Sequence, residues 1–290
     1  MTAHNNIAAV VVLYHPDASV LENIGAIIDQ VTVLYVVDNS ETSAQSVCTR
    51  LAAYTNVSVI HGNGNIGIAR ALNLAADHAL ARGCSFLLTL DQDSRPLPGM
   101  IEALIACHAS GVGLVAPRLL RGAERGSLSG ARCQPVLTAM TSGSLLNLAA
   151  YIQAGPFRED FFIDFVDIEY CLRLHTAGYS ILMAGSALLE HHVGTRIALG
   201  GRLNVTSHPA VRKYYKTRNR LLVWREYGGM FPGYIWRDRF RFVLELLRLL
   251  LFEPEKGAKL GMIRLTSPGQ HSTSGLGRKA IHILPLIKRL

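Results

Sequence analysis

Four apolar runs, each followed at once by polar residues or glycine, recur through the first third of the chain. They are Ile7–Leu13, Val31–Val37, Val57–His61 and Phe86–Leu90. All four predict strands; the continuous run Ile7–Leu13 predicts a strand that is covered on both faces, and Val31–Val37 a second buried strand. Helical patterns lie between them, at Ser19–Gln30, Ala44–Tyr54 and Ile68–Arg82. This repeated order predicts an α/β fold with a Rossmann-like, mostly parallel sheet and helices on both faces.

The residues that follow these strands indicate where a ligand would bind. In a parallel sheet, ligands bind beyond the carboxyl ends of the strands. Tyr14, Asp38, the turn Gly62–Gly67, and the pair Asp91 and Asp93 all fall at those ends. We therefore expect one site to be built from them.

The chain after residue 110 has a weaker pattern. Strands are expected at Val112–Ala116 and Tyr179–Ala184, and a Gly- and Arg-rich loop at Arg121–Gln134. Helices are expected at Asp164–Arg173, Lys213–Tyr227 and Arg237–Phe252. The pattern predicts a catalytic domain over residues 1–205 and a basic helical region over residues 206–290.

Composition excludes several classes of protein. Apolar residues make up 49% of the 290 residues and charged residues 17%, so the chain is not of the disordered kind. The five cysteines include no CxxC pair, which predicts neither a disulfide framework nor a zinc site and favours a reducing compartment. The polar start predicts no signal peptide, and no run is long enough to span a membrane. A cytoplasmic protein is expected.

Positive charge is concentrated in the last third of the chain. Residues 202–290 carry a net charge of +13, whereas residues 1–201 carry −5. Within the basic part, Arg237–Phe252 combines apolar residues at helical spacing with Arg237, Arg241 and Arg248. Such a helix is typical of peripheral attachment to an anionic membrane surface. Packing on the catalytic domain, or a homodimer contact, explains the same pattern. No recognition module for nucleic acid is present.

The turn Gly62–Gly67 matches GxGxxG between a strand and a helix. One interpretation is a dinucleotide site, with a pyrophosphate at the helix N-terminus and Asp91 on a ribose. The position after the third strand, and the lack of a second mononucleotide half, argue against it. An ordinary Gly/Asn turn is the simpler interpretation.

The segment Leu87–Ser94 runs from an apolar strand into Asp91-Gln92-Asp93. Haloacid-dehalogenase phosphatases begin in a similar way, with the first Asp as nucleophile, but Ser94 departs from their pattern. Alternatively, two carboxylates at this spacing clamp a divalent ion that neutralises a diphosphate. A solvated turn accounts for many such motifs.

Taken together and in order, eight motifs resemble the family 2 glycosyltransferases, which have the GT-A (nucleotide-diphospho-sugar transferase) fold. The motifs are VVVLYHP (10–16), VVDNS (36–40), GNGNIGIARALN (62–73), LTLDQDS (88–94), TSGSLL (141–146), FFIDFVDIEYCLR (161–173), HHVG (191–194) and YYKTRN (214–219). LDQDS and FIDFVDIEYCLR are most similar to bacterial rhamnosyltransferases, which use dTDP-L-rhamnose to build surface polysaccharides. The resemblance covers roughly residues 7 to 220.

The resemblance implies a nucleotide-sugar pocket at the carboxyl edge of the sheet. Tyr14 and Asp38 would contact the nucleoside, Asp38 at its base. Asn65, Gly67 and Arg70 would line the nucleotide pocket.

The resemblance also implies a metal-assisted sugar site. Asp91 would face the ribose or the sugar, and Asp93 would bind Mg²⁺ or Mn²⁺. Backbone N–H groups at Ser142-Gly143 would approach the sugar or the acceptor. His191 would complete the metal site, with His192 as its rival; for either one, a buried, hydrogen-bonded histidine is the simpler alternative.

Asp167 falls where the family carries its catalytic Asp, although Val166 replaces the Glu that precedes it there. Asp164 and Glu169 are therefore alternative candidates for the base. Asp164 and Asp167 lie three residues apart, and clustered carboxylates raise one another's pKa toward that of a useful base. Acidic residues that offset the helix dipole explain the same pattern.

The implied reaction is an inverting transfer from a dTDP-sugar, with L-rhamnose preferred, to a saccharide acceptor. The acceptor would belong to a bacterial surface polysaccharide of the O-antigen or lipopolysaccharide type, and it would be lipid-linked if the enzyme works at the membrane. The alternatives are a phosphatase that uses Asp91 and a non-catalytic nucleotide-sugar-binding protein.

Overall fold

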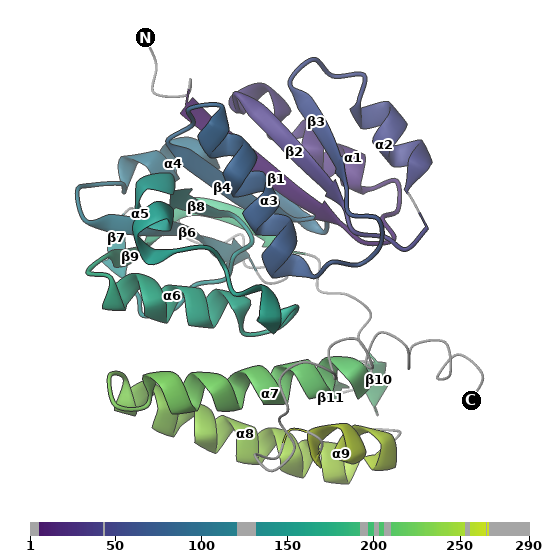
Figure 1. Cartoon of the computed structure of the whole chain (residues 1–290), viewed down its shortest axis with the longest axis vertical. Coiled ribbons are helices and arrows are strands. Elements are labelled where there is room, and N and C mark those ends of the chain that lie inside the picture. Colours follow the sequence, from purple (N-terminus) through teal and green to yellow (C-terminus); the bar gives the residue numbers. More distant parts are fainter. Residues whose placement is uncertain are drawn as a thin grey trace. The chain divides into compact units, whose positions relative to one another are not determined.

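The computed structural model describes residues 6–42, 44–120, 132–191, 197–199, 203–205, 210–252, 256–264 and 266. The chain divides into two compact units, Met1–Thr206 and Ser207–Leu290. The first unit contains the large sheet, and the second contains helices (Figure 1).

The sheet is built on four parallel strands, as the apolar runs predict. They are β1 (Ile7–Leu13), β2 (Val33–Asp38), β3 (Val57–His61) and β4 (Phe86–Asp91), in the order β3-β2-β1-β4. Leu13 pairs with Asp38, and Val12 pairs with Asp91. The polar residues that end these strands therefore lie along one edge, and this edge positions the candidate site.

Beyond β4 the sheet becomes mixed, which the prediction of a mostly parallel sheet did not foresee. The added strands are β5 (Ser94–Pro96), β6 (Val112–Leu120), β7 (Cys133–Pro135), β8 (Ser144–Asn147) and β9 (Ser180–His191). β8 runs antiparallel to β4 and β6, while β5 and β7 run antiparallel to β9. β5, β7 and β8 are only three or four residues long, so they leave little periodicity to detect.

Helices cover both faces of the sheet. One face of β1, with Ala9 and Val11, belongs to the main apolar core together with residues of α1 (Val20–Gly25), η2 (Ile28–Gln30), α2 (Gln45–Leu51) and α4 (Met100–Ala106). α3 (Ile68–Ala81) packs against β1, β2 and β4, and in Figure 1 it crosses in front of them. The alternating side chains of β1 are buried on both faces, as a continuous apolar run requires.

A second helical layer joins α3 to the segment that carries the candidate base. This layer consists of α5 (Leu148–Ala154), η3 (Glu159–Phe161) and α6 (Val166–Thr176). Asn73 of α3 donates to the carbonyl of Phe157 and accepts from the hydroxyl of Tyr151. Phe157 stacks on Tyr170 of α6, with ring centroids 4.0 Å apart. These buried contacts hold the start of α6 near α3.

The second unit contains α7 (Ala210–Tyr227), α8 (Pro232–Phe252) and α9 (Lys256–Arg264). Arg220 of α7, which is buried, donates to Asp238 and to both oxygens of Glu245 on α8. A short hairpin, β10 (Ile197–Leu199) and β11 (Leu203–Val205), precedes these helices in the chain. Among the described residues, we find no helix with the length and apolar character that crossing a membrane requires.

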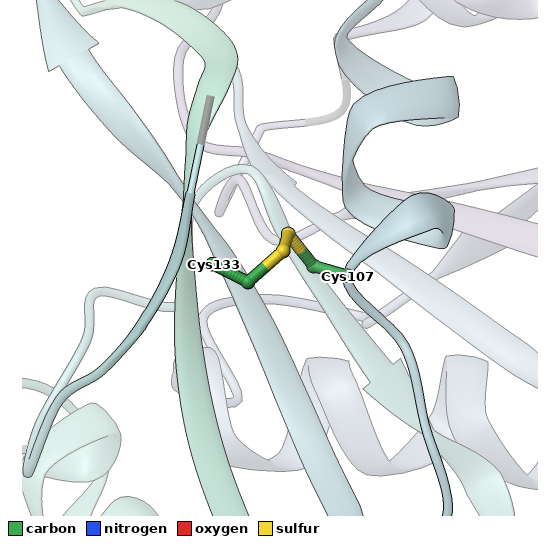
Figure 2. Close-up of a disulfide and its surroundings, with 2 residues drawn as sticks. All are labelled: Cys107 and Cys133. Carbon is green, nitrogen blue, oxygen red and sulfur yellow. A yellow bond between two sulfur atoms is a disulfide. The ribbon is translucent and has the colours of Figure 1, made fainter. Parts of the chain in front are cut away.

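Two cysteines form a disulfide, which corrects the expectation that the cysteines stay unpaired. Cys107 directly follows α4, and Cys133 begins β7; their Cα atoms are 5.5 Å apart (Figure 2). The residues are separated by 26 positions, and the pairing of β7 with β9 brings Cys133 beside the end of α4. Cys48, Cys84 and Cys171 are buried free thiols.

Candidate functional site

Backbone hydrogen bonds join the loops that follow β1, β2 and β3. Asn39 N–H donates to the carbonyl of Leu13, and Gly62 N–H donates to the carbonyl of Asp38. His15 N–H donates to the hydroxyl of Ser40 at 3.0 Å. The three loops therefore form one continuous surface at the carboxyl edge of the sheet.

Asp38 lies at this edge but is almost fully buried. Its Oδ1 accepts from the N–H of Ser40 at 3.1 Å, and its Oδ2 accepts from the N–H of Ala44 at 3.0 Å. His61 Nδ1 lies 3.8 Å from Oδ2. The carboxylate thus orders the loop after β2. The base contact expected of Asp38 remains a hypothesis, and its oxygens already have partners within the protein.

The side chain of Asn65 forms hydrogen bonds that stabilise the glycine-rich turn. Its Oδ1 accepts from the N–H of Gly67 and from the side chain of Asn39, each at 3.0 Å. Asn39 Oδ1 in turn accepts from the N–H of Ile66 at 2.8 Å. The amide of Asn39, which the sequence analysis did not single out, thereby locks the turn to the end of β2.

Gly67 is explained by packing. Its φ of +83° lies in the region that favours glycine, and a Cβ there would come within 2.6 Å of Phe162 Cδ2. The N–H of Ile68 donates to the carbonyl of Phe162 at 2.8 Å. This glycine therefore admits an aromatic residue of the segment that leads to α6, and the structure offers no support for the dinucleotide interpretation of the motif.

Tyr14 is held by the middle residue of the Asp-x-Asp motif. Its N–H donates to Gln92 Oε1 at 2.8 Å, and its carbonyl accepts from Gln92 Nε2 at 3.1 Å. The ring is exposed, and its hydroxyl donates to Glu41 at 3.1 Å. Partial burial, reinforced by Glu41, raises the pKa of Tyr14. The ring of Tyr14 therefore faces solvent at the carboxyl edge of the sheet.

The Asp91–Asp93 turn is fastened to the loop before β8. Ser142 Oγ accepts from the N–H of Asp91 at 2.9 Å and donates to Ser94 Oγ at 2.8 Å. Ser142 thus fixes the turn with its side chain. The N–H of Gly143 donates to the carbonyl of Thr89 at 2.6 Å, and a Cβ on Gly143 would clash with Pro117 and Leu189. The N–H of Gly143 is thus already used within the protein, and an approach of the Ser142-Gly143 backbone to a sugar or acceptor stays a prediction.

The carboxylates of Asp91 and Asp93 fit a divalent cation in their chemistry. Both residues are partly buried; Asp91 is the last residue of β4, which ends at the ligand edge, and Asp93 lies in the turn that follows. Ser94 pairs with His191 across β5 and β9, so the main chain of His191 lies next to this turn. Hard oxygen ligands of this type suit Mg²⁺ or Mn²⁺. Among the described residues, three or more metal-binding side chains do not gather at one point.

Asp167 lies in the first turn of α6 and is brought close to the Asp91 turn. Its Oδ1 accepts from the N–H of Ile168 at 2.8 Å. Desolvation raises the pKa of Asp167 to about 6, and repulsion from Asp164 and Asp91 adds to the increase. A carboxyl with this pKa is largely ionised at neutral pH and is still basic enough to accept a proton. These three carboxylates share one electrostatic neighbourhood, although Asp91 lies more than 70 positions before Asp164 and Asp167 in the sequence.

The segment before α6 has an unusual backbone. Phe162, Asp164 and Phe165 all have a positive φ, between 61° and 64°. Residues other than glycine rarely adopt this conformation, which is costly unless the surrounding structure imposes it. Here Phe162 is held against Gly67, and Phe165 is buried. The strained segment carries Asp164 and delivers Asp167 to the site.

Glu169, an alternative candidate for the base, has a structural partner. The side chain is 1% exposed and forms a bidentate ion pair with Arg173, with both N–O distances 3.0 Å. Arg173 also donates to the carbonyls of Ala154 and Pro156. This ion pair ties α6 to the end of α5, so the geometry favours Asp167 over Glu169 as the group that meets a substrate.

For the remaining candidate site residues that the structure describes, it gives only the position in the fold. Arg70 is exposed on the first turn of α3. The backbone of His191 belongs to β9, and His192 lies outside the described residues. The sequence analysis missed Asn39, Gln92 and Phe162. Asn39 and Gln92 stand inside the motifs VVDNS and LDQDS, so their position beside the candidate ligands was the available signal.

Known proteins resemble this chain in sequence. The sequence model of glycosyl transferase family 2 matches residues 9–132. The dTDP-rhamnosyl transferase RfbF of Shigella flexneri is 27% identical over 246 residues, covering 77% of this chain and 81% of that protein. The residues that the family model matches include the ends of β1 to β4 and the Asp91 turn.

Solved structures share the fold. TarS of S. aureus (residues 1–349, in complex with UDP-GlcNAc) matches with a TM-score of 0.60 and 11% identity, over 90% of this chain and 80% of that chain. GalNAc-T7, crystallised with UDP, GalNAc and Mn²⁺, matches with a TM-score of 0.59 and 13% identity. That match covers 82% of this chain and 51% of GalNAc-T7, so the chain spans about half of that protein. The likeness confirms the expected architecture of the first unit.

Proposed function

Since this chain belongs to the family 2 glycosyltransferases, we propose that it transfers L-rhamnose from dTDP-L-rhamnose to a saccharide acceptor of a bacterial surface polysaccharide. The observation that carries the proposal is the position of Asp167. Its carboxyl, with a pKa raised to about 6, stands in the electrostatic neighbourhood of Asp91 at the ligand edge. The similarity to a dTDP-rhamnosyl transferase supports the choice of donor.

The donor side of the site comprises the loops after β1, β2 and β3. Tyr14 offers an exposed ring on which a nucleobase can stack, and the Asn65–Gly67 turn borders the same edge. Asp38 keeps the loop after β2 in place. Arg70 projects from the first turn of α3, where its charge would attract the diphosphate. Asp91 faces the ribose or the sugar.

Transfer is a single displacement with inversion at the anomeric carbon. Asp167 accepts the proton of an acceptor hydroxyl while that oxygen forms a bond to the anomeric carbon. The bond from this carbon to the diphosphate oxygen breaks, and its electron pair leaves with dTDP. The carboxylate must come within about 3 Å of the acceptor oxygen to act as the base. Asp164 raises the basicity of Asp167 and is the second candidate for the role.

A divalent cation, Mg²⁺ or Mn²⁺, is part of the proposal. Asp93 would hold it, with Asp91 beside it and His191 on the neighbouring strand. When bound, such an ion supplies positive charge that stabilises a diphosphate leaving group. The hydroxyl of Ser142 and the side chain of Gln92 would keep the Asp91–Asp93 turn in position whether or not the ion is bound.

We place the enzyme in the cytoplasm, at the inner face of the cytoplasmic membrane. Its partners would be the dTDP-sugar and a saccharide acceptor, which at that location would be lipid-linked. The basic region 206–290 would meet the acceptor, the membrane or a second subunit.

A panel of nucleotide-sugars tests the donor. The melting temperature should rise with dTDP-L-rhamnose and Mg²⁺ more than with UDP-GlcNAc, because a ligand at 100 times its Kd adds about 2.7 kcal/mol of stability. Incubation with dTDP-L-rhamnose and acceptor oligosaccharides should release dTDP faster than incubation without acceptor. Release of inorganic phosphate that depends on Asp91 would indicate a phosphatase instead. Stabilisation without release under any condition would indicate a binding protein.

A further inference from the structure

One face of α8 is apolar and exposed along nearly its whole length. Trp236 is 70% exposed and Phe240 is 66% exposed. The stripe continues over the next three turns with Val243, Leu244, Leu247 and Leu250. At 3.6 residues per turn these six positions share one side of the helix. We call them the α8 stripe.

The α8 stripe faces away from the side of α8 that packs on α7. That packed side contains Asp238 and Glu245, which bind Arg220 of α7, and also Ile235 and Leu249, which are buried. In the second unit the stripe is therefore not the surface that joins these two helices. Six large apolar side chains on one exposed face mark an interaction site rather than scattered surface residues.

Positive charge borders the α8 stripe on both sides. Helical geometry puts Arg237, Arg241 and Arg248 along one border and Arg239 along the other. Arg239 also lies over the rings of Trp224 and Trp236, at 5.4 and 5.6 Å from their centroids. Apolar residues flanked by arginines, with a tryptophan at one end, match the two layers of a lipid surface, acyl chains beneath and headgroups above.

The charged residues of α8 indicate that its partner surface carries negative charge. Asp238 and Glu245 are the acidic residues of this helix, and both are used by α7. Two copies of the stripe in contact would bring arginines against arginines, with neither carboxylate available to offset them. An anionic surface instead attracts each arginine.

We propose that the α8 stripe lies on the anionic lipids of the membrane, with its apolar side chains among the acyl chains and its bordering arginines at the headgroups. This deepens the proposed function, because it rests on the proposal that region 206–290 meets a partner, and it identifies that partner as an anionic bilayer. The helix would lie in the plane of the interface.

Vesicle sedimentation with the full-length protein tests this proposal. Vesicles of phosphatidylcholine, with or without phosphatidylglycerol, are compared at low and high salt. The protein should sediment with the anionic vesicles at low salt, less so at high salt, and weakly with the neutral ones. Phe240→Glu with Leu247→Glu should reduce binding more than about tenfold, because two apolar side chains are lost from the acyl chains and charge is placed there instead.

Matched variants separate the stripe from general surface effects. Ile152→Glu changes a side chain that is 65% exposed on α5, and its binding should equal that of the wild type. Arg241→Gln with Arg248→Gln should weaken binding roughly tenfold and reduce its salt dependence. Arg50→Gln with Arg82→Gln, two exposed arginines of the first unit, should leave binding unchanged. The arginine variants keep the test decisive if the glutamate variant fails to fold.

Three results would overturn the proposal. The first is wild-type protein that stays in the supernatant with anionic vesicles at low salt. The second is unchanged binding when both the glutamate and the arginine pairs are introduced. The third is a dimer in solution that the glutamates dissociate, without vesicle binding. Stabilisation by dTDP, measured on the same samples, reports the donor site separately, so loss of vesicle binding with intact dTDP binding counts against the membrane proposal alone.

Discussion

The side chain of Gln92 holds the main chain of Tyr14 through two hydrogen bonds. Gln92 Oε1 accepts from the N–H of Tyr14 at 2.8 Å, and Gln92 Nε2 donates to its carbonyl at 3.1 Å. Asn23 Nδ2 donates to the main-chain carbonyl of Gln92 at 2.9 Å. The middle residue of the Asp-x-Asp motif therefore connects the proposed metal turn to the proposed nucleoside loop.

Gln92→Ala should weaken donor binding more than it slows transfer. Removing two hydrogen bonds worth about 1 kcal/mol each frees the loop after β1, so we expect the KM for the donor to rise roughly tenfold. The effect on kcat should be smaller, because Asp167 is untouched. Gln30→Ala removes a comparable amide-to-backbone bond, from Gln30 to the carbonyl of Ala26, and should leave KM unchanged. Equal KM values for the two variants would exclude the positioning role.

Asp167→Asn should retain dTDP binding but lose transfer by at least ~10²-fold, the usual size of a general-base effect. In the wild type, kcat should fall as the pH drops through about 6, because protonated Asp167 cannot accept a proton. Asp164→Asn tests the second candidate in parallel. If Asp167→Asn turns over normally while Asp164→Asn does not, the base is Asp164.

The same substitution should change stability in a pH-dependent way. The pKa of Asp167 is higher in the folded protein than its ordinary value of 3.8, so the folded state binds more protons between pH 3.8 and about 6. The stability that Asp167 contributes is therefore present below this range and is lost as the pH rises through it. Asp167→Asn should melt at a higher temperature than the wild type at pH 8, and this gain should shrink at pH 4.5. A gain that is constant with pH would contradict the assignment.

Asp93→Ala should abolish the metal dependence of donor binding. We expect Mg²⁺ or Mn²⁺ to increase the affinity of the wild type for dTDP-L-rhamnose and to have no effect on the variant. Asp160→Ala removes an exposed carboxylate that pairs with Arg158, and it serves as the control. Calorimetric titration of the donor with and without the metal measures both. An unchanged metal response in Asp93→Ala would remove this residue from the ligand set.

Glu245→Gln should destabilise the second unit at neutral pH. Desolvation opposes ionisation of Glu245, but hydrogen bonds from Arg220, together with the charges of Lys216 and Arg220, lower its pKa to about 2. Its stabilising contribution is present above the ordinary pKa of 4.5 and is lost as the pH falls toward 2. Because the side chain is partly exposed, we expect a loss of about 1–2 kcal/mol.

Fluorescence is suited to this measurement, because the chain's two tryptophans, Trp224 and Trp236, lie on α7 and α8. Unfolding in urea at pH 7 should show the lower midpoint of Glu245→Gln, and the difference from the wild type should decrease below pH 4. Glu102→Gln, on an exposed position of α4, should match the wild type throughout.

Much of the first unit could be predicted from the sequence. β1 and β3 begin and end at the predicted residues. For β1 the reason is local, because an apolar run bounded by polar residues determines a buried strand. The parallel direction expected of these strands also predicted that Tyr14, Asp38 and Asp91 share one edge. The strand boundaries and the shared edge depend only on neighbouring residues and on the geometry of parallel strands, so the local sequence pattern is enough to predict them.

Tertiary structure alone decided the partners of individual side chains. Gly67 belongs to a phosphate-like motif, yet Phe162, 95 positions later, fills the space beside it. The sequence made Glu169 a candidate for the base, but the fold pairs it with Arg173. Cys107 has no cysteine close to it in the sequence, yet it forms a disulfide with Cys133. Each outcome depends on how distant elements pack. Periodicity predicts which face of a helix or strand a residue lies on. It does not predict the atoms that the side chain contacts there, because those atoms belong to segments that come together only when the chain folds.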